Sequence, residues 1–267
     1  MRNPNTIVIT GGSSGIGAAL AMGYAAPGRQ LFLTGRNADR LADVGARVRA
    51  QGADCDTAVL DVTDQDAMRA WMTEIDTTAP IDLVIANAGI SGGTAGGLED
   101  DAQTRRILAV DLDGVLNTIQ PVIPRMVGRG GGQIALISSL AAFRGYTGAP
   151  AYCAAKAAVR VYGESLRGAL RADGIGVTVV CPGFVRSRMT DANTFRMPLL
   201  MDTDRAARII RRGLARNKAR IAFPWPTYFG AWLAATLPPA WVDPLINRMP
   251  RKGTLDQGAG GVPPDRR

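Results

Sequence analysis

Thr10-Gly11-Gly12-Ser13-Ser14-Gly15-Ile16-Gly17 joins a short apolar run, Thr6–Thr10, to a helical pattern over Ile16–Ala26. The start of a helix carries free backbone N–H groups and the positive end of the helix dipole, so it attracts anions. Glycines permit a tight turn and let a phosphate group approach the backbone. The spacing is neither the common G-x-G-x-x-G nor a P-loop. The stretch predicts a phosphate-binding turn, and a plain flexible glycine turn is the alternative.

From this turn to residue 185, short apolar runs alternate with longer helical patterns. Such an order is typical of parallel strands that are buried on both faces and joined by right-handed helical crossovers. We therefore predict the α/β class, with a doubly wound parallel sheet and helices on both of its faces. Strands are expected at Thr6–Thr10, Gln30–Thr34, Thr57–Asp61, Leu83–Ala86, Gln133–Ser138, Gly176–Cys181 and Arg220–Phe223, and helices at Ile16–Ala26, Arg40–Gln51, Gln65–Thr77, Ala102–Arg129, Ala151–Asp173 and Thr203–Lys218.

The length of 267 residues favours one elaborated domain over two. We predict a single domain over residues 1–252. Within it, 186–220 has little periodicity at its start and is expected to form a substrate lid, and 221–252 is an apolar C-terminal segment. Residues 253–267 are rich in Gly and Pro and are predicted to be a disordered tail.

The composition excludes several kinds of site. The chain contains no histidine, which removes Ser-His-Asp and Cys-His nucleophilic sites and imidazole metal ligands. Its three cysteines, Cys55, Cys153 and Cys181, are too widely spaced for a zinc site or a disulfide framework. We expect no metal and a reducing compartment. Met1–Asn5 is polar and opens no signal peptide, so the expected location is the cytoplasm.

The end of the second predicted strand, Leu33-Thr34-Gly35-Arg36-Asn37, bears on the cofactor. A dinucleotide site usually places Asp or Glu here to accept hydrogen bonds from the adenosine ribose. Arg36 suits a 2′-phosphate instead, because a guanidinium grips phosphate with paired hydrogen bonds. The sequence therefore favours NADP(H) over NAD(H), with a solvated arginine as the alternative.

Candidate catalytic groups lie on and before the helix that begins near residue 151. Tyr152 and Lys156 are four residues apart and share one helix face. A nearby ammonium and a bound nicotinamide cation would favour the phenolate, so we expect a lowered Tyr152 pKa and an acid–base group that needs no histidine. The Ser139 hydroxyl could hold the substrate oxygen as charge develops on it.

Together these motifs resemble the short-chain dehydrogenase/reductase family. The matches occur in family order over residues 6 to about 190. They are Thr10-Gly11-xxx-Gly15-Ile16-Gly17, Asp61-Val62, Asn87-Ala88-Gly89, Ser139, Tyr152-xxx-Lys156 and Pro182-Gly183-x-Val185-x-Ser187. The resemblance implies a Rossmann fold of about seven strands in the order 3-2-1-4-5-6-7.

The same resemblance implies roles for individual residues. Tyr152 would give a proton to a carbonyl, Lys156 would bind ribose and activate the tyrosine, and Ser139 would orient the substrate. The implied cofactor contacts, together with those of Tyr152 and Lys156, come from Gly11, Ser13, Ser14, Gly15, Ile16, Gly17, Arg36, Asp61, Val62, Asn87, Ala88, Gly89, Pro182, Gly183, Val185 and Ser187.

The chain departs from the family at two places. Asp111 aligns with the family's helix asparagine, which holds a water beside the catalytic lysine. An aspartate can also hold a water, and it adds negative charge near Lys156, so we expect activity with an altered pH profile. At the C-terminal end, Ile221–Pro226 replaces the usual strand and Asp-Gly-Gly, and about 40 residues follow. This ending resembles the branch that acts on lipid-like or steroid-like ketones, some members of which sit on membranes.

The basic charge and the aromatic residues concentrate in the last third. Residues 1–185 hold 16 Lys+Arg against 17 Asp+Glu, whereas 186–267 hold 15 against 6. Trp225, Trp232 and Trp241 lie in the same part of the chain. A homodimer or homotetramer interface, peripheral contact of 221–249 with an anionic membrane, and core packing all fit this composition. Prolines interrupt 221–242, so no transmembrane helix is expected, and without a recognition motif we expect no nucleic-acid partner.

The predicted function is NADP(H)-dependent interconversion of a ketone and a secondary alcohol, with a small hydrophobic carbonyl compound or alcohol as substrate. The alternative is a non-catalytic NADP(H)-binding module that senses redox state or acts as a scaffold. Ser139, Tyr152 and Lys156 favour the enzyme, and Asp111 slightly favours the sensor.

Overall fold

The computed structural model describes residues 3–191, 193, 195–249 and 251–255. At its centre is a seven-stranded parallel sheet in the order β3-β2-β1-β4-β5-β6-β7, so the predicted topology is confirmed. The chain adds β2 and β3 on one side of β1 and then adds β4 and the later strands on its other side. The carboxyl ends of β1 and β4 therefore lie side by side at the point where this order changes, and ligands bind at such points in open α/β sheets. The strands are β1 (Thr6–Thr10), β2 (Gln30–Gly35), β3 (Asp54–Val59), β4 (Leu83–Ala86), β5 (Gly132–Ile137), β6 (Ile175–Pro182) and β7 (Arg220–Phe223).

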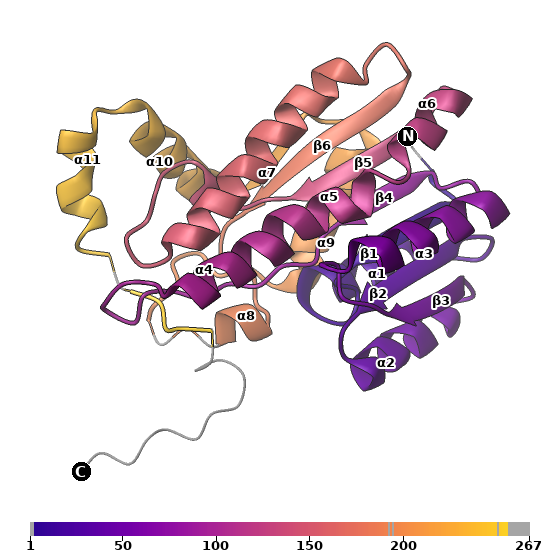
Figure 1. Cartoon of the computed structure of the whole chain (residues 1–267), viewed down its shortest axis with the longest axis horizontal. Helices are drawn as coiled ribbons and strands as arrows, with labels where there is room; N and C mark the ends of the chain where they lie inside the picture. The colour runs from indigo at the N-terminus through magenta and orange to yellow at the C-terminus, as the bar shows by residue number, and fades with distance from the viewer. Residues whose placement is uncertain (1–2, 192, 194, 250, 256–267) are drawn as a thin grey trace.

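Helices cover both faces of the sheet (Figure 1). Alternation along β1 shows why two apolar layers form: Ile7 and Ile9 pack on one face with α1, α2 and α9, while Val8 packs on the other with α3, α5 and α7. The helices are α1 (Gly15–Tyr24), α2 (Ala38–Arg49), α3 (Gln65–Thr78), α4 (Asp101–Leu108), α5 (Gly114–Ile119), α6 (Ile123–Arg129), α7 (Pro150–Ala169), α8 (Arg188–Asp191), α9 (Thr203–Ala215), α10 (Trp225–Thr236) and α11 (Pro239–Ile246), with a π-helical turn at Ala109–Asp113 and a 3-10 turn at Leu140–Ala142.

Two predicted elements are wrong in detail. The strand expected at Thr57–Asp61 is β3, which ends at Val59, because an edge strand with alternating exposure gives a weak apolar signal. The single helix expected over Ala102–Arg129 is divided into α4, the π-helical turn, α5 and α6. The break between α5 and α6 falls at Gln120, directly before Pro121. The residue before a proline is disfavoured in a helix.

The C-terminal segment forms two short helices, α10 and α11, that project from one end of the sheet (Figure 1). No helix in the described part of the chain is long and apolar enough to cross a membrane. After α11, residues 251–255 return to the body, and the Leu255 N–H donates to Gln103 Oε1 over 2.8 Å. Disorder is therefore the wrong prediction for Gly253–Leu255, and the rest of the expected tail, 256–267, lies outside the described residues.

Candidate active site

The glycine loop between β1 and α1 has the shape of an anion cradle. Gly11 and Gly15 have φ of 66° and 55°, a region that favours glycine. A Cβ on Gly17 would lie 2.3 Å from the Gly11 carbonyl oxygen, so only glycine fits there. Ser14 is the N-cap residue of α1, but its side chain makes no capping hydrogen bond and the first turn holds no acidic residue. The open N–H groups of this turn fit a phosphate.

Asn87 joins this loop to the end of β4. Its Nδ2 donates to the carbonyl oxygens of Thr10 and Gly11 over 2.9 and 3.2 Å. In return, Thr10 Oγ1 accepts from the N–H groups of Asn87 and Ala88 over 3.1 and 3.2 Å. These hydrogen bonds of the Thr10 side chain were not predicted, although Thr10 is the first residue of the glycine-loop motif.

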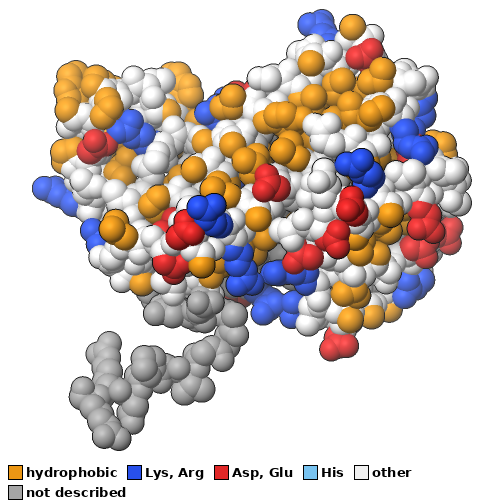
Figure 2. Space-filling view, viewed as in Figure 1, with side chains coloured by type: hydrophobic (Ala, Val, Ile, Leu, Met, Phe, Trp, Pro, Cys, Tyr) orange, Lys and Arg blue, Asp and Glu red, His pale blue; other side chains and the backbone are white. Residues whose placement is uncertain are grey.

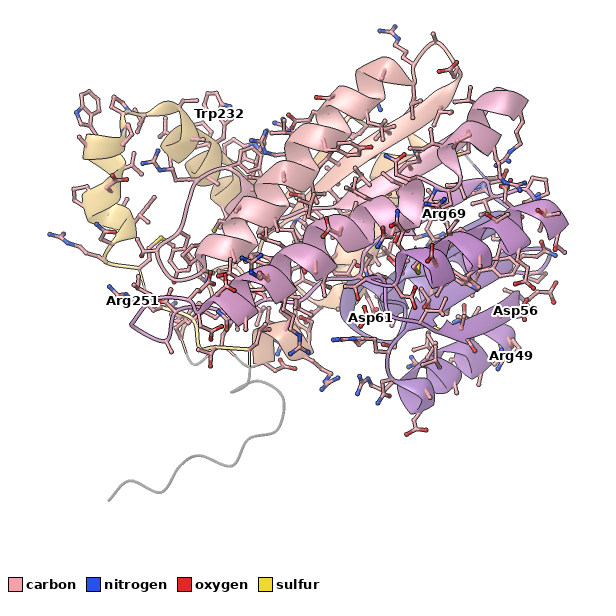
Figure 3. All side chains as sticks on the ribbon, viewed as in Figure 1. Arg49, Asp56, Asp61, Arg69, Trp232 and Arg251 are labelled. Carbon is pink, nitrogen blue, oxygen red and sulfur yellow. The ribbon has the colours of Figure 1, made fainter. Side chains whose placement is uncertain are left out.

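The residues expected at the two ends of a dinucleotide lie on either side of the loop. Arg36 pairs with Asp61 over 3.8 Å, and both side chains are about half exposed. Asp61 is labelled in Figure 3. A Cβ on Gly35 would lie 3.0 Å from Ser13 Oγ, so the loop approaches the end of β2 closely. On the other side, a Cβ on Gly15 would lie 3.3 Å from Ser187 Cβ, which places the segment after β6 against the loop.

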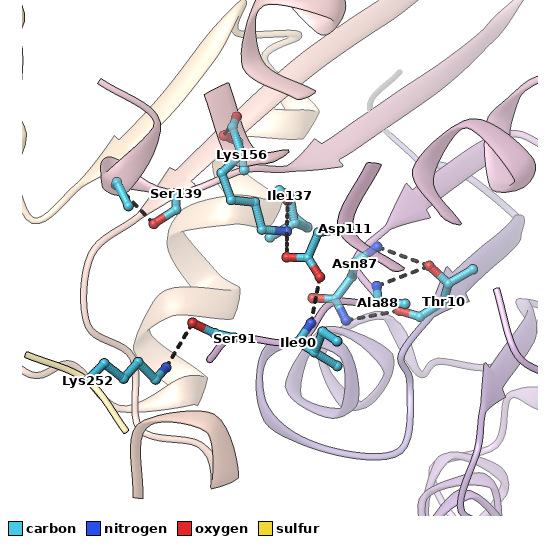
Figure 4. A network of polar contacts seen from close by, with 12 residues as sticks. Thr10, Asn87, Ala88, Ile90, Ser91, Asp111, Ile137, Ser139, Lys156 and Lys252 are labelled. Atoms are coloured by element: carbon cyan, nitrogen blue, oxygen red, sulfur yellow. Dashed lines mark hydrogen bonds and ion pairs between the residues drawn. The ribbon is translucent and has the colours of Figure 1, made fainter. Parts of the chain in front are cut away.

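Further along the same edge of the sheet, Lys156 and Asp111 form a buried ion pair. Lys156 Nζ lies 3.1 Å from Asp111 Oδ2 and donates to the Ile137 carbonyl oxygen over 3.2 Å (Figure 4). Asp111 Oδ1 accepts from the Ile90 N–H over 2.7 Å. Burial pulls the Lys156 pKa down, but Asp111 and Tyr152 more than offset this, so the pKa is raised and Lys156 stays an ammonium.

The contact between these two side chains shows how Asp111 places its negative charge at Lys156. A separation of 3.1 Å leaves no room for a water between Nζ and Oδ2, so the aspartate acts on the lysine directly. Its position in the π-helical turn turns the carboxylate toward β4 and α7. Burial raises the Asp111 pKa, against the opposing effects of Lys156 and the Ile90 N–H.

Tyr152 lies beside this pair. Lys156 Nζ is 5.7 Å from the centre of its ring. Burial raises the Tyr152 pKa, Lys156 and the Ser139 hydroxyl lower it, and Asp111 raises it. The expected lowering of this pKa rested on the ammonium and a bound nicotinamide cation together, and burial outweighs the ammonium alone. Such a phenol carries its proton at neutral pH.

Ser139 completes the group. Its Oγ accepts from the Ala141 N–H over 3.1 Å, which leaves its own hydrogen free to donate. The neighbouring Ser138 Oγ donates to the Lys156 carbonyl oxygen over 2.7 Å and so fixes α7 to the end of β5. The structure thus brings Ser139, Tyr152, Lys156 and Asp111 together, as expected from their places in the sequence.

Two features near the site were not predicted. A groove of about 510 Å³ lies beside the glycine loop and is lined by Ser13, Ser14 and Arg40 among others; Tyr152 and Lys156 are not part of it. Lys252 donates from its Nζ to Ser91 Oγ over 2.9 Å. Nothing in the local sequence around Lys252 indicates that it belongs near the site.

Known proteins match both the glycine loop and the Tyr152–Lys156 helix. A model of the short chain dehydrogenases matches residues 5–196. An uncharacterized oxidoreductase of Myxococcus xanthus is 37% identical over 245 residues, which cover 91% of this chain and 97% of that one. For an uncharacterized oxidoreductase of Mycobacterium tuberculosis the identity is 36% over 223 residues, covering 82% and 88%. A solved short-chain dehydrogenase from Sphingobium yanoikuyae, in complex with NADPH, has a TM-score of 0.77 at 26% identity and covers 97% of this chain and 98% of that one.

Proposed function

The chain belongs to the short-chain dehydrogenase family, and from this premise we propose that it interconverts a hydrophobic ketone and its secondary alcohol with NADP(H). The family's fold binds a nicotinamide cofactor, and the open glycine loop fits its pyrophosphate. One observation carries the proposal: the Tyr152 ring lies 5.7 Å from the Lys156 ammonium, and the Ser139 hydroxyl stands at the start of the 3-10 turn that follows β5. These are the groups that carbonyl reduction requires in the absence of histidine.

The residues divide the chemistry among them. When bound, the cofactor supplies or accepts the hydride. In reduction, Tyr152 gives its phenol proton to the ketone oxygen, and its raised pKa keeps that proton available at neutral pH. Ser139 donates to the same oxygen as negative charge develops on it. The Lys156 ammonium then stabilises the phenolate that remains.

Turnover separates this proposal from a non-catalytic sensor or scaffold. The test follows NADPH absorbance with short, acyl-chain and steroid ketones. Oxidation of NADPH by at least one class of ketone supports an enzyme. Tight NADPH binding without oxidation in any of the three classes would favour the sensor.

We expect Arg36→Leu to weaken NADPH binding about tenfold and to leave NADH binding unchanged, because a guanidinium at the end of β2 meets only the 2′-phosphate. Equilibrium dissociation constants from NADPH fluorescence titration measure the effect. Arg69→Leu, at an exposed position on α3, is the matched control (Figure 3). Equal losses for both cofactors, or for neither, would contradict a 2′-phosphate role for Arg36.

We also propose that α10 and α11 form a subunit contact of a homodimer or homotetramer. Apolar side chains gather over this end of the molecule (Figure 2). Trp225 and Trp241 are 69% and 73% exposed, and Phe229 stacks on Trp225 with ring centres 5.6 Å apart. No residue of α10 is buried in the chain itself. Such an apolar, aromatic surface is typical of protein interfaces.

The double variant Trp225→Ser/Trp241→Ser is expected to lose this self-association, because it removes the two most exposed aromatic rings. Sedimentation velocity of the full chain measures the loss, and Val161→Ser, at an exposed apolar position on α7, is the control. A monomeric parent that sediments with anionic vesicles through the same two tryptophans would instead establish membrane contact.

A further inference from the structure

Residues 251–255, which we call the C-terminal strap, lie against the loop that follows β4. The Gly93 N–H donates to the Gly253 carbonyl oxygen and the Ala95 N–H to the Lys252 carbonyl oxygen, each over 2.8 Å. A Cβ on Gly93 would lie 2.5 Å from the Lys252 carbonyl oxygen, so only glycine permits this approach. These two hydrogen bonds pair the strap with the backbone of this loop.

The strap reaches the candidate active site. Leu255 packs in one apolar cluster with Ile90, Ile107 and the ring of Tyr152. Lys252 donates from Nζ to Ser91 Oγ, and Ser91 follows Ile90, whose N–H holds Asp111 (Figure 4). A continuous set of contacts therefore connects Lys252 to the Asp111–Lys156 pair and places a second ammonium at the site.

The charge of Lys252 is poorly balanced where it lies. Among the described residues, no carboxylate oxygen lies within 4.0 Å of its Nζ. Asp111 acts on it from a greater distance and is already paired with Lys156. Burial lowers the Lys252 pKa to about 8, with Asp111 opposing the change. An ammonium has three donors, and Ser91 takes only one of them.

We propose that Lys252 and Ser91 form an anion subsite that binds a carboxylate of the substrate. An incoming carboxylate would supply a counter-charge and accept hydrogen bonds from the Lys252 ammonium. Leu255 and Ile90 would contact the apolar part of the same molecule. The subsite rests on the proposed ketone chemistry and narrows its substrate class to keto acids with an apolar body.

Catalytic discrimination tests the subsite directly. The oxohexanoate isomers are compared with their methyl esters, and the readout is the ratio of kcat/KM for acid over ester. We expect Lys252→Met to lower this ratio about tenfold to a hundredfold, because a charge-assisted hydrogen bond is lost. Lys252→Arg is expected to retain most of the preference. Lys218→Met, at an exposed lysine, is the control with the parent ratio.

A binding experiment does not depend on turnover. Hexanoate and hexanamide are titrated calorimetrically into the full chain saturated with NADP⁺. The subsite is supported if hexanoate binds more tightly than hexanamide and Lys252→Met loses this difference with an unchanged thermal unfolding midpoint. This result would hold even if no ketone is reduced. Three outcomes overturn the subsite even if ketones are reduced. They are equal binding of hexanoate and hexanamide, no binding of hexanoate, and an acid-to-ester ratio in Lys252→Met equal to that of the parent.

Discussion

Replacing Tyr152 with phenylalanine is expected to lower kcat/KM for ketone reduction about 10²- to 10⁴-fold, the usual contribution of a positioned proton donor. The variant removes only the hydroxyl. The ring that packs near Ile90 and Leu255 stays, so the fold and its thermal unfolding midpoint should be retained. Steady-state kinetics with NADPH and the best ketone of the panel measure the loss. Tyr162→Phe, on the same helix α7, is the matched control and should stay close to the parent.

The pH dependence of the parent gives a second readout of the same group. Because burial raises the Tyr152 pKa, the proton that reduction requires is present at neutral pH and is lost only in the alkaline range. Alcohol oxidation requires the phenolate and should therefore speed up as the pH rises. Turnover that survives in Tyr152→Phe, or an oxidation rate that is flat through the alkaline range, would exclude this phenol as the proton carrier.

Breaking the Asp111–Lys156 pair is expected to destabilise the fold by about 3–5 kcal/mol, because either single truncation leaves an unpaired charge in a buried place. Asp111 is 0% and Lys156 3% exposed, so the remaining charge would stay out of contact with bulk water. Urea unfolding of Asp111→Ala, Lys156→Met and the double variant measures the free energies of unfolding. The double variant should lose clearly less than the sum of the two singles. Additive losses would show that the two groups do not stabilise each other.

The isosteric variant Asp111→Asn separates charge from shape. The Asp111 carboxylate raises the Tyr152 pKa and supports the Lys156 ammonium. Without it, the Tyr152 pKa should fall, and the alkaline rise of alcohol oxidation should move to lower pH. A pH–rate profile and rate equal to those of the parent would remove Asp111 from the proposed mechanism.

The order of elements follows well from local sequence. Apolar runs locate the buried strands β1 and β4 at the predicted residues, since strands covered on both faces are apolar throughout. The edge strand β3 and the division of the long central helix were harder. The first has little buried surface, and the second falls partly at Pro121, which disfavours a helical Gln120.

By itself the sequence determined the α/β class, because apolar runs and helical patterns alternate along it. The sheet order, and most of the residues that gather at the carboxyl edge of the sheet, followed from the resemblance of its motifs to the short-chain dehydrogenases. Only the tertiary structure decided how these groups titrate and what else joins them. The direction of the Tyr152 pKa is a sum of burial and charge over many neighbours, and motif spacing carries no information about that sum. Lys252 meets Ser91 across 161 positions of sequence, a separation at which no local pattern constrains contact and only the folded chain brings the two together.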